Sequence, residues 1–207
     1  MPSSLTHPPL SLLQTFACKD TLPLVPDQVW QLEQGIVRTL TWDSEGHITT
    51  LGIWGRGDVV GLPLTQLSPY QMECLTPVAV TEIPLGSQSR YWQEALLNHL
   101  CRSQELFSIV QNPSISAGLL NLLYWLATRF GREIADGWML KPILTHKQLA
   151  EVIGSSRVTV TRILTRLEEE GRLLRIRKRQ GYGSHSVAAA GPSRAILLPK
   201  LETKGGY

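Results

Sequence analysis

The sequence has few of the residues on which metalloenzymes and disulfide-rich proteins depend. Its three cysteines, Cys18, Cys74 and Cys101, lie far apart and offer no disulfide framework or iron–sulfur cluster. The five histidines are also scattered, whereas a small β-barrel metalloenzyme needs close histidines together with a carboxylate. The sequence contains no nucleophile elbow, P-loop lysine motif or complete dinucleotide fingerprint. We therefore expect no enzyme activity, no metal and no cofactor.

Long apolar runs are absent as well. No stretch reaches the ~18–20 apolar residues that are needed to cross a bilayer. The N-terminus, MPSSLTHPPL, lacks the basic stretch and apolar core of a signal peptide. Together with the dispersed cysteines, these absences predict a protein of a reducing cytoplasm. The 207 residues suffice for one large domain or two small ones.

The charge is unevenly distributed, although the net value is only +3. Residues 1–137 contain 7 Lys/Arg and 12 Asp/Glu, whereas residues 138–207 contain 13 Lys/Arg and 5 Asp/Glu. A basic domain attached to an acidic one recurs among nucleic-acid-binding proteins. A basic tail that only aids solubility is the simpler alternative, so the asymmetry alone favours nucleic acid slightly.

The N-terminal half has the pattern of a small antiparallel barrel or roll. After a Ser/Pro/Thr-rich lead-in over residues 1–22, β-branched and aromatic runs alternate with turn residues such as Asp43-Ser44-Glu45-Gly46. Glycines in WGRGDVVGLPL mark further turns. The predicted strands cover residues 35–42, 47–54, 71–75 and 78–84.

The period changes to that of a helix between residues 91 and 111. Positions 93, 96, 100, 103, 107 and 110 alternate steps of three and four, which makes a short, partly polar heptad seam. This helix could lie on the roll or pair with the same helix of a second subunit, and the periodicity favours neither. Asn112-Pro113 ends it; an apolar helix over 114–130 and a short strand over 137–144 follow.

Two helices joined by a tight glycine turn come next. Thr145-His146-Lys147-Gln148 has the form of a capping box, and Gly154 is placed to end the helix that begins there. Ser155 or Ser156 can cap the second helix. At helical spacing this second helix buries Val160, Ile163, Leu164 and Leu167. The arrangement predicts a helix-turn-helix.

The other side of the second helix carries polar and basic residues near its N-terminal end: Arg157, Val158, Thr161, Arg162 and Thr165. Arginine can donate two hydrogen bonds to guanine, and valine methyls suit the methyl group of thymine. A solvated polar face is the usual alternative for such a pattern. However, the acidic run 168–170 lies at the far end of the helix, and this separation of charge favours contact with DNA.

A basic two-stranded wing is expected after Gly171, with strands within residues 173–180 and 195–199. Its arginines and lysine suit phosphates on either side of a DNA groove. The loop between the strands is long for a hairpin.

With these motifs the chain resembles the Crp/Fnr family of transcription regulators. Within residues 117–180, LTHKQLAEVIGSSRVTVTRILTRLEEEGRL follows the winged-helix motif of the family closely. Within residues 32–62, LEQGIVRTLTWDSEGHITTLGIWGRGDVVG follows its β-roll pattern of spaced glycines. RVTVTR is similar to the recognition helix of the cyanobacterial global nitrogen regulator, NtcA. Val158 stands where many family members have Glu, an acceptor for cytosine.

The resemblance implies an α+β homodimer in three segments. These are a shortened N-terminal β-roll of the cyclic-nucleotide-binding type (residues 1–86), a dimerisation helix (87–112) and a C-terminal winged helix-turn-helix (113–207). It also implies a palindromic DNA site with GTA…TAC half-sites, recognition helices ~34 Å apart, and contact with RNA polymerase. The pairing residues would be Leu96, Leu100, Phe107 and Val110.

The same resemblance assigns the DNA contacts. The base-contacting residues would be Arg157, Val158, Thr161 and Arg162. The phosphate-contacting residues would be Thr145, Lys147, Ser156, Thr159, Arg177, Lys178 and Arg179.

The sequence supports none of the familiar effectors of the family. Residues 61–75 lack the arginine and the Gly-Glu pair that hold a cyclic phosphate. The positions of the arginines that hold 2-oxoglutarate in the nitrogen regulator are occupied by Ser68 and His99. We expect an unfamiliar ligand or none, with control by abundance. The main alternative is a dimeric protein-interaction module or small-ligand sensor that uses DNA weakly. Salt dependence distinguishes the two: the affinity for DNA falls steeply as the salt concentration rises, whereas the affinity for a protein partner need not.

Overall fold

The computed structural model describes residues 13–85, 90–177 and 194–200. By its internal contacts the chain divides into two compact units, Met1–Ser103 and Gln104–Tyr207. We call them the N-terminal unit and the C-terminal unit.

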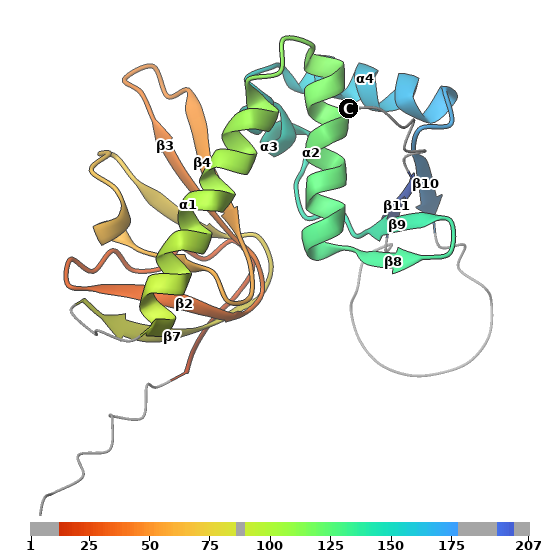
Figure 1. Cartoon of the computed structure of the whole chain (residues 1–207). Coiled ribbons are helices and arrows are strands. Elements are labelled where there is room, and N and C mark those ends of the chain that lie inside the picture. Colours follow the sequence, from red (N-terminus) through yellow and green to blue (C-terminus); the bar gives the residue numbers. More distant parts are fainter. Residues whose placement is uncertain (1–12, 86–89, 178–193, 201–207) are drawn as a thin grey trace, which may run out of the picture. The chain divides into compact units, whose positions relative to one another are not determined.

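The N-terminal unit is a β-roll made of two antiparallel sheets (Figure 1). One sheet has the strand order β1-β7-β2-β5 and the other has the order β4-β3-β6. The predicted strands are confirmed, with small shifts of their ends, as β3, β4, β6 and β7. The elements are β1 (Gln14–Phe16), β2 (Gln28–Gln34), β3 (Val37–Trp42), β4 (Ile48–Trp54), β5 (Val59–Val60), the 3-10 helix η1 (Leu62–Leu64), β6 (Gln71–Cys74) and β7 (Val78–Pro84).

The core of the roll lies between the two sheets. Trp30 and Leu32, alternate residues of β2, meet Trp54 of β4 and Met72 of β6 there, and each is at most 2% exposed. Strand alternation places every second side chain of β2 on this inner face. The roll therefore has a filled hydrophobic core made by side chains from both sheets.

Two predictions about the roll are wrong. The loose lead-in over residues 1–22 is ordered from residue 13, because β1 pairs with β7 and Leu22 is fully buried in the core. So short an edge strand is specified by the partner it meets, which is distant in sequence. The strand predicted from Gly35 begins later, since Gly35 forms the turn after β2 with φ +89°. A Cβ there would lie 2.2 Å from the carbonyl oxygen of Pro77, so the turn requires glycine.

Helix α1 (Arg90–Val110) confirms the helix predicted after the roll. In its first half, Ala95 packs against Val29 of β2 and Val59 of β5. One face of this half therefore lies on the roll, whereas Glu94, Leu96, Leu97 and Asn98 are exposed.

Besides the end of α1, the described part of the C-terminal unit contains helices α2, α3 and α4 and a four-stranded antiparallel sheet with the order β10-β11-β9-β8. The strand predicted over 137–144 is wrong beyond Leu140, because Pro142 has no N–H for a ladder; strand β8 was not predicted. The elements are α2 (Ile115–Phe130), β8 (Arg132–Ile134), β9 (Gly137–Leu140), α3 (His146–Ile153), α4 (Arg157–Glu169), β10 (Leu174–Arg177) and β11 (Arg194–Pro199). Over the described ranges, no helix is long and apolar enough to span a membrane.

Candidate nucleic-acid interface

Helices α3 and α4 form the predicted helix-turn-helix. At the start of α3, the backbone N–H of Gln148 donates to Thr145 Oγ1 (3.2 Å), and the Thr145 N–H donates to Gln148 Oε1 (2.9 Å). These two bonds are the reciprocal pair of a capping box. Gly154 ends α3 in the left-handed conformation, with φ 67°. Both sequence signals for this turn are confirmed.

Helix α4 is preceded by Ser156, whose Oγ accepts a hydrogen bond from the Thr159 N–H (3.1 Å). Of the two serines that could cap this helix, Ser156 does so. The predicted inner face is buried at Val160, Leu164 and Leu167 and half-buried at Ile163. The helix therefore turns its other face towards solvent.

The four predicted base-contacting residues share this outer face of α4. Arg157, Val158, Thr161 and Arg162 are all exposed, and Val158 is 65% exposed. A valine so open on a helix surface has no packing role, so its methyl groups are available to a partner. The outer face thus offers two guanidinium groups and exposed methyl groups within the first two turns of the helix.

The hydroxyl group of Thr161 is already engaged. It donates to the carbonyl oxygen of Arg157 (2.9 Å) and lies 2.9 Å from Nδ1 of His146. Since its only hydrogen is directed to Arg157, the hydroxyl accepts from the Nδ1–H of His146. What remains for a base is mainly the methyl group of Thr161. His146 was missed from the sequence, because the residue that it orients lies on another helix.

Four of the predicted phosphate-contacting residues, Thr145, Lys147, Ser156 and Thr159, lie at the N-termini of α3 and α4. Lys147 is exposed and pairs with Glu151, with 3.7 Å between Nζ and Oε1. The Ser156 and Thr159 hydroxyls lie 2.9 Å apart and share one hydrogen bond, which leaves one hydroxyl hydrogen for a phosphate. The Thr145 hydroxyl donates to Gln148 Oε1.

The wing residues in the prediction are less completely described. Arg177 is the last residue of β10, which pairs with β11 and confirms the two-stranded wing. Lys178 and Arg179 lie outside the described residues. Their assignment, and that of Arg177, stays a prediction.

The predicted pairing face of α1 is open along most of its length. Leu96, Leu100 and Phe107 are 36%, 55% and 64% exposed, and Val110 is half-buried. Leu97, which was not predicted, is 63% exposed and lies beside them. Large apolar side chains that recur on one helix usually mark an association surface.

Where the nitrogen-regulator resemblance implies an effector-binding arginine, His99 of α1 is packed onto the roll. Its ring stacks on Trp54 with centroids 4.0 Å apart and an interplanar angle of 7°, and its Nδ1 lies 3.0 Å from the carbonyl oxygen of Val59. Trp54 Nε1 donates to Thr39 Oγ1 (2.9 Å). Burial lowers the pKa of His99, although the Val59 carbonyl and the charge of Asp58 oppose this shift. The neutral imidazole is therefore the form that fits the stack.

A β-roll followed by a long helix and a winged helix-turn-helix, whose second helix exposes arginines, defines a DNA-binding regulator. The comparisons agree with this class. A model of the Crp-like helix-turn-helix domain matches residues 119–182. Regulatory protein CysR of Synechococcus elongatus is 38% identical over 157 residues, which cover 74% of this chain and 75% of CysR. A global nitrogen regulator of Nostoc is 26% identical over 170 residues, which cover 74% and 75%.

Solved structures show the same fold. A transcriptional regulator of the CRP family from Thermus thermophilus matches with a TM-score of 0.67 and 22% identity over 89% of this chain and 91% of that one. FixK2 from Bradyrhizobium japonicum matches with a TM-score of 0.68 and 16% identity over 91% and 92%. The chain belongs to the Crp/Fnr family of DNA-binding transcriptional regulators. The relatives are regulators rather than enzymes.

Proposed function

We propose that the chain regulates transcription as a homodimer that binds a palindromic DNA site. The single observation that carries this proposal is the outer face of α4, where Arg157, Val158, Thr161 and Arg162 are exposed together. Arginines at the N-terminal end of a recognition helix can each donate two hydrogen bonds to guanine in the major groove. In this proposal the chain has three functional segments: the roll (1–86), the pairing helix (87–112) and the DNA-binding domain (113–207).

Contact with RNA polymerase is part of the same proposal. It is supported by the membership of the chain in a family of transcription regulators. A polymerase recruitment assay on the selected DNA site, with and without the protein, tests this contact.

We also propose that the roll takes neither a cyclic nucleotide nor 2-oxoglutarate. Residues 61–75 contain no arginine for a cyclic phosphate. Trp54 and the Val59 carbonyl engage the ring of His99. Isothermal titration with cyclic AMP, cyclic GMP and 2-oxoglutarate tests this; saturable binding of any of them contradicts it.

The proposed function is tested by selecting binding sites from random duplex DNA with the purified full chain and no added ligand. We expect an enriched palindrome with GTA-like half-sites. Arg162→Ala should then weaken the selected site by ~1–3 kcal/mol and relax one base position. Arg166→Ala, which removes a charge one turn further along α4, is the matched control and should weaken selected and random DNA alike. Equal losses on both DNAs for Arg162→Ala would refute its assigned role.

A further inference from the structure

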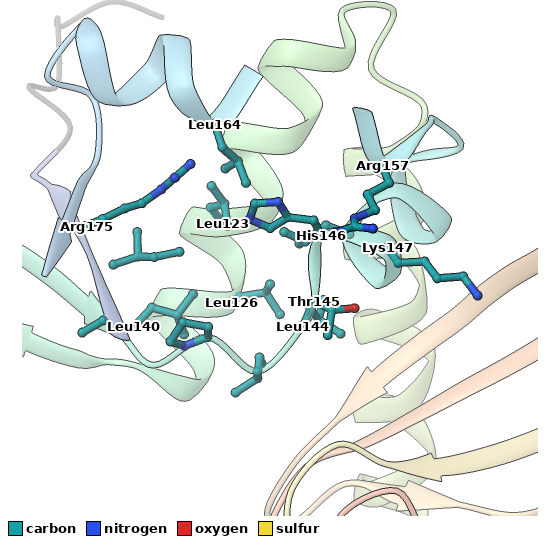
Figure 2. A pocket seen from close by; sticks show the side chains of 15 residues that line it. Leu123, Leu126, Leu140, Leu144, Thr145, His146, Lys147, Arg157, Leu164 and Arg175 are labelled. Carbon is teal, nitrogen blue, oxygen red and sulfur yellow. The ribbon is translucent and has the colours of Figure 1, made fainter. Parts of the chain in front are cut away.

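The C-terminal unit contains a cavity of about 590 Å³ beneath the helix-turn-helix (Figure 2). Its walls come from α2, β9, the start of α3, α4 and the wing strands β10 and β11. Pockets for small organic ligands usually measure ~300–1,000 Å³, so this cavity has room for one.

Most of the wall is apolar. Leu123 and Leu126 of α2, Leu140 of β9 and Leu164 of α4 face the cavity, and each is at most 2% exposed. Leu144 and Ile196 also belong to this surface. Such a lining gains free energy when it covers an aliphatic or aromatic group, in proportion to the apolar area removed from water.

The polar groups of the wall are cationic or neutral. Arg175, Arg157, Lys147 and His146 line the cavity, and none of the lining residues in the described part of the chain is Asp or Glu. Figure 2 shows Arg175 reaching in from β10 and His146 in the middle of the group, whereas Lys147 points away. The positive charge of Arg175 and Arg157 therefore complements an anion.

The guanidinium group of Arg175 has one nitrogen without a hydrogen-bond acceptor among the described residues. Its Nε lies 3.5 Å from Oε2 of Glu168, but its Nη2 is buried and has no hydrogen-bond partner among the described residues. A buried donor of a charged group without an acceptor is costly. An anionic oxygen in the cavity would satisfy it with a charge-assisted hydrogen bond.

We propose that this cavity binds an amphipathic organic anion, with its apolar tail against the leucines and its carboxylate or sulfonate head at Nη2 of Arg175. Because Arg157 lines the cavity and His146 positions Thr161, the bound anion also acts on the outer face of α4. It adds negative charge near the surface that meets phosphates, so it lowers the affinity for DNA, and DNA lowers the affinity for the anion by the same factor. This second step depends on the proposed function; the binding site itself does not.

The test uses the full chain without DNA and 1-anilinonaphthalene-8-sulfonate, whose fluorescence rises in an apolar site, as the probe. We expect saturable binding, with displacement by decanoate and much weaker displacement by decanol, which has the same tail and no charge. Arg175→Gln should weaken probe and decanoate binding roughly 10- to 100-fold, the range of one hydrogen bond to a charged group. Arg172→Gln is the matched control: it removes the same charge from an arginine that pairs with Glu170 and does not line the cavity.

A second variant tests the contribution of the cavity volume independently of the charge of Arg175. Ala195→Leu adds volume on the β11 wall and should reduce binding while the circular dichroism spectrum stays unchanged. Equal binding by the Arg175→Gln and Arg172→Gln proteins, or no saturable binding, overturns the site. Decanoate binding that leaves DNA affinity unchanged overturns only the coupling. A protein that binds decanoate but no DNA sequence contradicts the proposed function and leaves the site standing.

Discussion

Replacement of Phe107 should separate the two subunits. Phe107 of α1 is 64% exposed in the single chain, and complete burial of such a side chain stabilises by about 1.5–3 kcal/mol. Covering the exposed part is therefore worth about 1–2 kcal/mol. A two-fold symmetric dimer contains each residue twice, so Phe107→Ala removes about 2–4 kcal/mol. Since 1.4 kcal/mol corresponds to a factor of ten, the dimer dissociation constant should rise roughly 30- to 700-fold.

Sedimentation velocity over a range of protein concentrations measures this constant directly. Leu67→Ala is the control, because Leu67 is also an exposed apolar residue (49%) but belongs to the loop after η1 and not to α1. It should leave the dimer intact. Binding to a palindrome should weaken with Phe107→Ala, whereas binding to a single half-site should not. A dimer that is equally stable in both variants would refute the assignment of this helix face.

Three further predictions concern particular side chains. The hydroxyl of Thr161 bonds to Arg157 and His146, so only its methyl group is left for a base. Thr161→Val should therefore keep the selected base sequence, whereas Thr161→Ser should relax a thymine position. Site selection with each variant measures this, and the reverse result would show that the hydroxyl contacts the base. The lowered pKa of His99 means that the unfolded chain binds more protons, so the free energy of unfolding should fall as the pH drops below about 6.5, the ordinary histidine value. Urea titrations at pH 8 and pH 5 should find this fall reduced in His99→Phe, which keeps an aromatic ring against Trp54, and an unchanged fall would contradict the burial of His99. Gly52→Ala places a Cβ 2.1 Å from the ring of Trp54, so it should lower the free energy of unfolding by ~1–3 kcal/mol, and a neutral effect would show that the stack yields easily.

The helix-turn-helix could be predicted from the sequence because its signals are local. A capping box, a left-handed glycine and an N-cap serine each act within four residues, and the structure contains all three at Thr145, Gly154 and Ser156. The positions of the strands in the roll could also be predicted, because turn residues separate them. Their pairing into two sheets came only from the family resemblance.

The interactions that could not be predicted join residues far apart in the chain. His146 meets Thr161 across two helices, and His99 meets Trp54 across the roll and α1. Nothing in the local sequence around a histidine indicates which ring or hydroxyl will face it. The strand around Thr15 was missed for the same reason, since its partner lies near the end of the roll.

The atoms available on α4 narrow the sequence that this regulator should recognise. Residue types alone leave Thr161 free to donate, accept or offer a methyl group. With its hydroxyl directed to Arg157 and His146, the outer face presents two guanidinium groups, at Arg157 and Arg162, beside the methyl groups of Val158 and Thr161. Guanidinium groups select guanine, and methyl groups select thymine. Neither valine nor this threonine offers the carboxylate that would accept from cytosine. The exposed atoms thus favour half-sites in which guanine and thymine adjoin, and this is an argument for the GTA type that does not depend on the family resemblance.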